Sequence, residues 1–188
     1  MSNIILFAPR RFGDNRGWFT ENFNARREAD NGIDVAFVQD NQSYSTLSGT
    51  VRGIHFQRPP HAQAKLIRCS RGSLIDYVVD LRRGSPTYGQ YISAGLSAQN
   101  GQQLFIPVGF GHAFITLEPG TEICYKVSDY YDPDCDAGIR WDCPEIAIDW
   151  PLSSPAVLSD KDVALPTLAD FESPFDYDGQ PIQLVSVK

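Results

Sequence analysis

Histidine is the side chain best suited to proton transfer near neutral pH, and this sequence contains three of them. One, His55, lies in the strand-like run Arg52-Gly53-Ile54-His55-Phe56-Gln57. It is either a structural residue with a satisfied hydrogen bond or a general base, which needs a pKa near the working pH. Because alternate residues of a strand share a face, a regular strand would turn Arg52 and His55 to opposite sides, unless Gly53 introduces a bulge.

Further residues could assist such a base. Lys65 begins an apolar strand and is either a rim charge or a fixed cation beside a developing oxyanion. Tyr125 and Tyr131 supply phenols, which either pack in the core or act as general acids. Asp162 is either a favourable acid at a helix start or the carboxylate that orients a catalytic histidine. The glycine-rich turn before His112 favours a buried, hydrogen-bonded histidine there.

The spacing of the possible metal ligands does not predict a metal centre. The three histidines are scattered and form no H-x-H pair, and no two cysteines form a C-x-x-C pair. A zinc site or a catalytic metal is therefore not expected, and reduced thiols are. The cysteines are Cys69, Cys124, Cys135 and Cys143.

The charge distribution is uneven along the chain. The net charge of −7 argues against nucleic acid as a partner. Residues 41–117 nevertheless carry seven basic side chains and two acidic ones, whereas residues 118–188 carry four basic and fifteen acidic. The middle segment is either a solvated basic face or a pocket for a small anion such as a sugar phosphate or nucleotide. Its basic residues are Arg52, Arg58, Lys65, Arg68, Arg71, Arg82 and Arg83.

The elements that must position these residues are mostly strands. Apolar alternation, punctuated by turn residues about every ten positions, predicts an all-β antiparallel sandwich or barrel, with a jelly roll as the natural form. Short helices are expected at Asn24–Ala29 and at Asp160–Ala164, the second with Ser159 as its N-cap. The expected strands are Ile4–Ala8, Gly17–Phe23, Val35–Asn41, Thr50–Phe56, Ala64–Cys69, Leu74–Asp80, Gln90–Leu96, Gln102–Ile106, His112–Thr116 and Glu122–Asp129.

A chain of 188 residues with 42% hydrophobic residues suits one domain with its own core. No apolar run approaches the roughly 20 residues of a membrane span, and the first residues do not read as a signal peptide, so a cytoplasmic protein is expected. The tail from Ile146 is acidic and rich in proline, and Trp150 and Phe171 could attach it to the body.

Taken together and in order, these segments resemble one family, the dTDP-4-dehydrorhamnose 3,5-epimerases, which are cupin-like jelly rolls. The R-G-x-H-F-Q and G-F-x-H-x-F blocks are the most specific. The matching segments are Asp14-x-Arg16-Gly17-Trp18-Phe19-x-Glu21, Val38-Gln39-Asp40-Asn41, Arg52-Gly53-Ile54-His55-Phe56-Gln57, Lys65-Leu66-Ile67-Arg68, Asp80-Leu81-Arg82, Ser85-Pro86-Thr87-Tyr88-Gly89, Ile106-Pro107-x-Gly109-Phe110-x-His112-x-Phe114, Tyr125-Lys126, Tyr130-Tyr131 and Ser159-x-Lys161-Asp162.

The resemblance implies a role for each matching residue. His55 corresponds to the catalytic base, Asp162 to its carboxylate partner, Tyr125 to the general acid on the opposite face, and Lys65 to the lysine near the substrate O4. Asp76 corresponds to an acid behind the site. The substrate contacts that it implies are Arg52 and His112 near the sugar and phosphates, Tyr131 as another pocket residue, and Arg16, Phe19, Glu21, Gln39 and Asn41 near the nucleotide.

The resemblance further implies a single jelly-roll epimerase domain over residues 1–188, with a C-terminal extension from about 163, and a homodimer in which some nucleotide contacts cross the interface. It implies no metal or redox cofactor, because the C3 and C5 protons of a 4-keto sugar are acidified by the carbonyl. Three alternatives stay open: an epimerase that inverts one carbon or acts on a related nucleotide 4-keto sugar, a non-catalytic sugar-binding jelly roll, and a metal-dependent cupin isomerase or dioxygenase.

Overall fold

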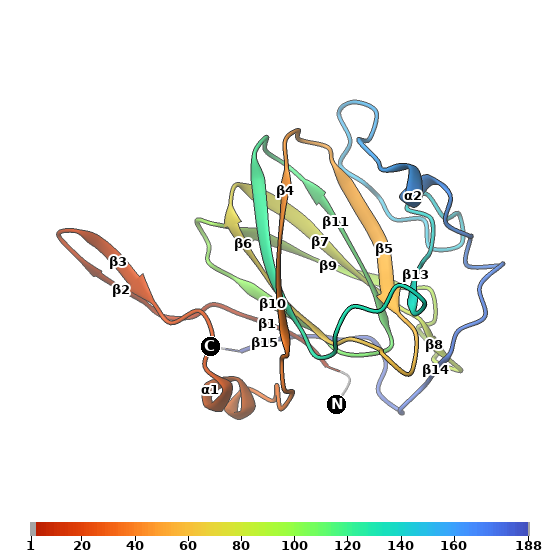
Figure 1. Cartoon of the computed structure of the whole chain (residues 1–188), viewed down its shortest axis with the longest axis horizontal. Coiled ribbons are helices and arrows are strands. Elements are labelled where there is room, and N and C mark those ends of the chain that lie inside the picture. Colours follow the sequence, from red (N-terminus) through yellow and green to blue (C-terminus); the bar gives the residue numbers. More distant parts are fainter. Residues whose placement is uncertain (1–2, 188) are drawn as a thin grey trace.

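Two stacked sheets make up most of the computed structural model, which describes residues 3–187 (Figure 1). The expected all-β sandwich is confirmed, and no helix of the described residues is long and apolar enough to cross a membrane. The six-stranded sheet has the order β15 (Leu184–Ser186), β1 (Ile4–Phe7), β10 (Gln103–Ile106), β6 (Lys65–Arg71), β12 (Thr121–Val127), β4 (Gln39–Ser45). The five-stranded sheet has the order β13 (Asp136–Gly138), β5 (Val51–Gln57), β11 (Phe110–Thr116), β7 (Ser73–Asp80), β9 (Tyr91–Ser97).

Two small ribbons and two short helices complete the fold. An isolated hairpin, β2 (Arg11–Asp14) with β3 (Gly17–Thr20), projects away from the sandwich, and β8 (Arg82–Arg83) pairs with β14 (Phe175–Asp176). Helix α1 (Ala25–Asp30) is capped by Asn24. Helix α2 (Asp160–Val163) is capped by Ser159, as the sequence predicts, and lies near the β5 edge of the five-stranded sheet.

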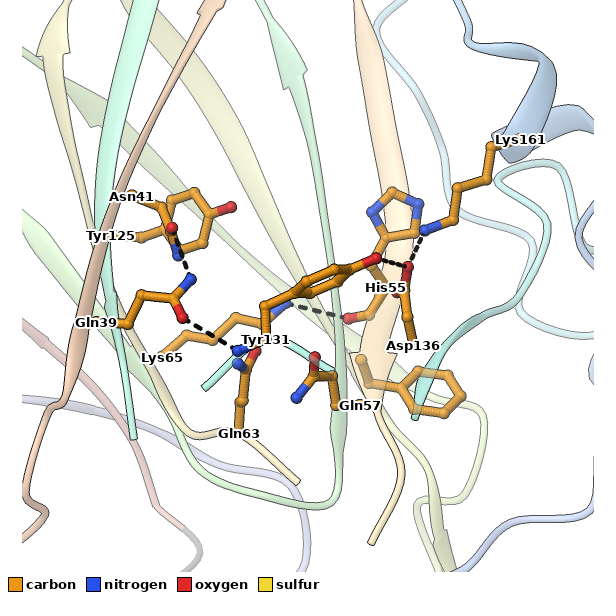
Figure 2. Close-up of a pocket in the computed structure, with 11 residues that line it drawn as sticks. Gln39, Asn41, His55, Gln57, Gln63, Lys65, Tyr125, Tyr131, Asp136 and Lys161 are labelled. Carbon is orange, nitrogen blue, oxygen red and sulfur yellow. Dashed lines mark hydrogen bonds and ion pairs between the residues drawn. The ribbon is translucent and has the colours of Figure 1, made fainter. Parts of the chain in front are cut away.

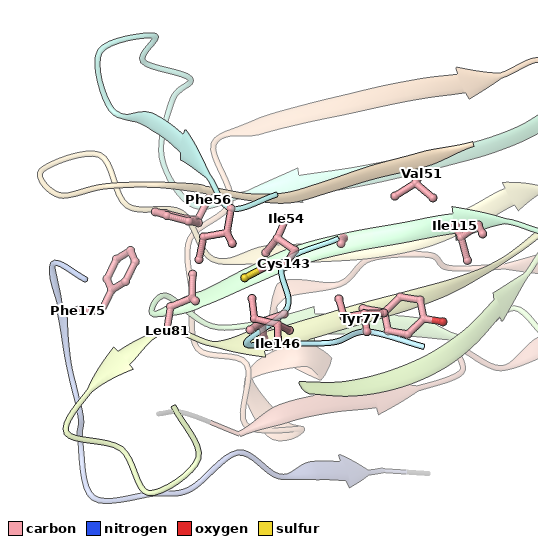
Figure 3. Close-up of a cluster of buried hydrophobic side chains, with 13 residues drawn as sticks. Val51, Ile54, Phe56, Tyr77, Leu81, Ile115, Cys143, Ile146 and Phe175 are labelled. Carbon is pink, nitrogen blue, oxygen red and sulfur yellow. The ribbon is translucent and has the colours of Figure 1, made fainter. Parts of the chain in front are cut away.

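Three apolar clusters hold the layers together. The central one lies between the two sheets and joins residues such as Ile67 and Leu104 to Val78 and Phe114. A second covers the outer face of the five-stranded sheet with the segment from 139 onward (Figure 3). Trp150 and Phe171 pack against that second cluster, so the predicted attachment of the tail is confirmed. The third packs the outer face of the six-stranded sheet against residues 33–37.

Two strand predictions at the N-terminal end are wrong in position. The expected strand Val35–Asn41 lies four residues further on, as β4. Val35 and Phe37 are not strand residues, because their side chains pack against the third cluster. The expected strand Gly17–Phe23 ends at Thr20, and its partner β2 was not predicted. Strands β2, β3 and most of β4 are exposed or half-exposed, so they lack the apolar alternation that reveals strands.

A β-bulge in β5 decides which side chains face the space between the sheets. His55 pairs with His112 while Arg52 pairs with Phe114, so β5 has one more residue than β11 over this stretch. Val51 and Ile54 therefore both join the second cluster, the outer cluster of the five-stranded sheet, whereas Arg52 and His55 lie on the opposite face, where Arg52 donates to the carbonyl of Tyr44 in the other sheet. At Gly53 φ is +125° and a Cβ would lie 2.5 Å from the Cβ of Ala113, so only glycine suits the bulge.

Two strand glycines of the same sheet provide a test of this packing. A Cβ at Gly111 in β11 would lie 2.4 Å from Cγ2 of the fully buried Ile54, whereas a Cβ at Gly95 in β9 would meet open space. Gly111→Ala should lower the free energy of unfolding by about 1–3 kcal/mol through overpacking. Gly95→Ala, the matched control, should change it by less than about 0.5 kcal/mol. Urea denaturation measures both, and equal effects would contradict the packing described.

Candidate active site between the two sheets

A cavity of about 430 Å³ opens between the edges of the two sheets (Figure 2). One wall comes from the six-stranded sheet and the other from β5, β13 and α2. Six of the predicted site residues line it: Gln39, Asn41, His55, Lys65, Tyr125 and, from the loop after β12, Tyr131. Sequence reasoning assigned no role to five other lining residues, although three of them belong to the matching segments: Phe56, Gln57, Gln63, Asp136 and Lys161.

His55 is held by a buried carboxylate, as predicted. Its Nε2 lies 2.5 Å from Oδ1 of Asp162, whose side chain is 4% exposed. The other oxygen of Asp162 accepts a hydrogen bond from the Ser159 hydroxyl at 2.7 Å. Burial alone would raise the pKa of Asp162, but the hydrogen bonds from His55 and Ser159 outweigh it and lower that pKa. The ionised carboxylate orients the imidazole and stabilises its charged form, which is the arrangement of a general base.

Lys65 reaches across from the six-stranded sheet toward His55. Its Nζ donates to the backbone carbonyl of His55 at 3.4 Å. Burial lowers the pKa of Lys65 to about 8, against the opposing attraction of the carboxylates of Asp76 and Asp136. A lysine in this environment is still mostly charged at neutral pH, and it supplies a cation beside His55.

A second histidine–carboxylate pair lies directly behind the cavity. His112 is the cross-strand partner of His55, and its Nε2 lies 2.9 Å from Oδ2 of Asp76. Burial lowers the pKa of His112 and raises that of Asp76. Oδ1 of Asp76 is buried and has no hydrogen-bond partner within the described part of the chain. The expectation of a buried, hydrogen-bonded His112 is therefore confirmed, and His112 does not belong to the cavity lining.

Tyr125 and His55 lie on opposite sides of the cavity (Figure 2). Burial raises the pKa of Tyr125, so its hydroxyl keeps its proton at neutral pH and can donate it. Tyr131 extends across the mouth, its backbone N–H donating to Oε1 of Gln39 at 3.0 Å and its hydroxyl to Asp136 at 3.2 Å. Asp136 is also ion-paired with Lys161, which links the mouth to α2.

The nucleotide contacts expected on the N-terminal hairpin are not at this cavity. Arg16 lies at its tip and pairs with Asp14 at 2.6 Å, and the Phe19 ring is 68% exposed. Glu21 follows the hairpin, 3.5 Å from the guanidinium of Arg27. The hairpin projects away from the sandwich, so none of the three predicted residues meets the cavity of its own chain (Figure 1).

The basic middle segment does not form one anion pocket, and this prediction is corrected. Arg82 is buried and binds both oxygens of Asp80 and one of Asp178, and Arg83 pairs with Asp176. Only Lys65 of the seven basic residues lines the cavity. Arg52 lies nearby, donating to the carbonyl of Tyr44 at 3.1 Å, and its charge acts on Tyr125. Basic residues that are close in sequence point to different faces of their strands, and carboxylates of the C-terminal tail pair with two of the arginines.

The remaining predictions concern metal ligands and thiols. Within residues 3–187, no group of three or more histidine, cysteine, aspartate or glutamate side chains is arranged to hold a metal ion. The four cysteines are free thiols, as expected.

The charge on Lys65 should depend on the carboxylate behind it. Lys65 should lose its proton at about pH 8, being charged below and neutral above. Asp76→Asn removes the largest attraction that opposes burial, so it should move this titration to lower pH. NMR titration of the lysine side chains measures the shift, with Lys126, ion-paired to Asp40, as the internal reference. An unchanged Lys65 titration in the folded variant would contradict this electrostatic coupling.

Comparison with known proteins supports the sequence resemblance. The family model described as dTDP-4-dehydrorhamnose 3,5-epimerase matches residues 1–170. A dTDP-4-dehydrorhamnose 3,5-epimerase of Sinorhizobium fredii is 49% identical over 177 residues, which is 94% of this chain and 91% of that protein. A dTDP-4-dehydrorhamnose 3-epimerase of Streptomyces niveus is 39% identical and covers 86% of this chain and 78% of that protein.

Solved structures agree in fold. A dTDP-4-dehydrorhamnose 3,5-epimerase of Bacillus anthracis with TDP and PPi bound has a TM-score of 0.83 and 51% identity, covering 86% of this chain and 91% of that chain. The dTDP-6-deoxy-D-glucose-3,5-epimerase of Legionella pneumophila, in complex with dTDP-4-keto-L-rhamnose, has a TM-score of 0.86 and 37% identity, covering 94% of this chain and 100% of that chain. From its sequence, its sandwich and these likenesses, the chain belongs to the dTDP-4-dehydrorhamnose 3,5-epimerase family.

Proposed function

We propose that the chain is a cofactor-independent epimerase that converts dTDP-4-dehydro-6-deoxy-D-glucose to dTDP-4-dehydro-L-rhamnose by inverting C3 and C5. The observation that carries the proposal is the placement of a carboxylate-bound histidine, His55, opposite a protonated phenol, Tyr125, with the cation of Lys65 in the same cavity. A sugar-binding module needs no such opposed base and acid, so this arrangement favours catalysis over simple binding.

Each inversion then consists of two proton transfers. His55 removes the proton from C3 or C5, and the electron pair of the broken C–H bond moves into the carbonyl to form an enolate with its negative charge on O4. Lys65 stabilises that charge. Tyr125 delivers its hydroxyl proton to the same carbon from the opposite face, and O4 returns to a ketone. Solvent then takes the proton from the His55 imidazolium and restores the Tyr125 hydroxyl, so no metal or redox cofactor enters the balance.

The family relatives support this substrate and also supply the main alternative. The B. anthracis and L. pneumophila structures contain TDP and dTDP-4-keto-L-rhamnose respectively. The S. niveus relative is a 3-epimerase, so a single inversion is the second candidate. Solvent deuterium incorporation into dTDP-4-keto-6-deoxyglucose, followed by carbon position, separates the two. Label at both C3 and C5 supports the proposal, and label at C3 alone favours the alternative.

Substitution of the base and the acid should have different effects. His55→Ala should abolish both deuterium exchange and epimerisation, because no group remains to remove the proton. Tyr125→Phe should still exchange protons with solvent but should epimerise about 10²–10⁴-fold more slowly, because the donor is missing. Asp162→Asn should reduce activity by weakening the orientation of His55 while leaving the base in place.

Circular dichroism serves as the folding control for all three variants. A folded Tyr125→Phe variant that epimerises at the wild-type rate would show that another donor, such as water or Tyr131, protonates the sugar.

We also propose a homodimer in which the hairpin completes the partner's site. Arg16 and Phe19 are exposed on an arm that meets no cavity of its own chain. Strand β4, which carries Gln39 and Asn41, is an unpaired edge of the six-stranded sheet and so is open to a second chain.

We further propose that residues 1–188 form one domain with a C-terminal extension from about 163. The pairing of β14 with β8 and of β15 with β1 supports this, because it joins the extension to two strands of the body.

Mixing two inactive variants tests the shared site. Arg16→Ala and His55→Ala should each impair activity, but a refolded mixture should recover up to about a quarter of wild-type activity, because half the dimers are mixed and each contains one complete site. Sedimentation checks the dimer. A fully active monomer at micromolar concentration, or a mixture no more active than the average of its parts, would contradict the proposal.

A further inference from the structure

The segment 129–135, which carries Tyr131 over the mouth of the cavity, is tied to the turn after β5. The amide of Gln57 donates to the carbonyls of His61 and Tyr130, at 2.6 and 3.1 Å, and accepts from the N–H of Asp132 at 2.8 Å. The Gln63 amide donates to the carbonyl of Asp129 at 2.8 Å. Both glutamines also line the cavity, so the wall and the rim are one hydrogen-bonded unit.

His61 fastens the outer side of the same segment. Its Nδ1 lies 3.3 Å from Oδ2 of Asp129, and its Nε2 lies 3.6 Å from Oδ2 of Asp132. The other oxygen of each carboxylate is used within the segment. Oδ1 of Asp129 accepts from the N–H of Tyr130 at 2.7 Å, and Oδ1 of Asp132 accepts from the N–H of Asp134 at 2.8 Å. One imidazole therefore bridges two carboxylates that shape the rim.

The two ring nitrogens of His61 make contacts of different kinds. Nδ1 is within hydrogen-bond distance of Asp129, at 3.3 Å. Nε2, at 3.6 Å, is too far from Asp132 for a hydrogen bond and lies at ion-pair distance. The proton-transfer steps proposed above do not use His61, and it is absent from the cavity lining.

We propose that His61 is a positioning residue that holds the 129–135 segment in place and thereby holds Tyr131 ready for the nucleotide part of the substrate. This inference rests on the proposed function, since it assigns an effect on nucleotide affinity to a residue that does not contact the cavity. It concerns the binding of the substrate rather than the proton transfers, so the effect belongs in KM and in dTDP affinity and not in kcat.

Polar groups of the neighbouring turn support the same contacts. The carboxylates of Asp129 and Asp132 face the His61 ring, and the backbone N–H of His61 donates to the carbonyl of Arg58. The Arg58 guanidinium donates to the carbonyl of Asp134, near the end of the same segment.

Calorimetric titration with dTDP tests the proposal directly. His61→Gln should weaken dTDP binding about two- to fivefold, the range expected for half-exposed ion pairs. His61→Arg keeps a cation beside both carboxylates and should restore the wild-type affinity. Arg140→Gln is the matched control: Arg140 has the same 42% side-chain exposure, is ion-paired to Asp142, and its loss should leave binding unchanged.

Hydrogen exchange at one pH locates the effect. In the His61→Gln variant, backbone amide protons should exchange faster within 129–135 and at the wild-type rate in the rest of the chain. Unchanged dTDP affinity in His61→Gln, or faster exchange throughout the chain, would overturn the positioning role while leaving the proposed function standing. A wild-type protein that does not bind dTDP would overturn the proposed function, and this inference with it.

Discussion

The extra residue of β5 sets the orientation of the site because it changes which side chains face the space between the sheets. Without it, Arg52 and His55 could not share a side while Val51 and Ile54 both join the outer cluster. The bulge depends on the close approach of Gly53 to Ala113, which leaves no room for a side chain. The packing that stabilises the five-stranded sheet and the direction of His55, the proposed base, therefore depend on the same few backbone atoms.

Burial of charge between the sheets follows from this orientation. Isolated charges are costly in an apolar interior, and each one here has an opposite charge or a hydrogen-bond partner. Asp162 is paired with His55, Asp76 with His112, and Lys65 faces both Asp76 and Asp136. The same pairing produces the properties that the proposed chemistry needs, namely an ionised acid behind the base, a cation whose pKa falls to about 8, and a phenol that keeps its proton.

The two walls of the cavity differ in how they are supported. The proposed base and acid project from strands of the two sheets. Tyr125 is on β12, which contributes to the central core, and His55 is on β5, whose apolar residues pack in the second cluster, so both backbones are fixed by sheet hydrogen bonds and packing. The mouth is a loop held by side chains, with Gln57 and Gln63 on the inside and His61 on the outside. The proposed base and acid are therefore held by the sheets, whereas the position of the rim depends on a few side-chain contacts.

The sequence by itself determined the features that depend on local pattern. Apolar alternation located the central strands, Ser159 marked the start of α2, and the ordered motifs identified the family and most of the cavity residues. These succeed because strand faces and helix caps are set by residues close together in the chain. The same logic failed for β2 and β4, which are exposed and so carry no apolar pattern.

Only the tertiary structure decided which distant residues meet. Arg82 belongs to the basic segment in sequence but is neutralised by Asp80 and by Asp178 of the tail, almost a hundred residues away. Asp136 and Lys161 enter the cavity because β13 pairs with β5 and α2 lies beside it. Such long-range contacts depend on how the sheets and tail pack as a whole, and a local sequence pattern contains no information about the partner across that packing.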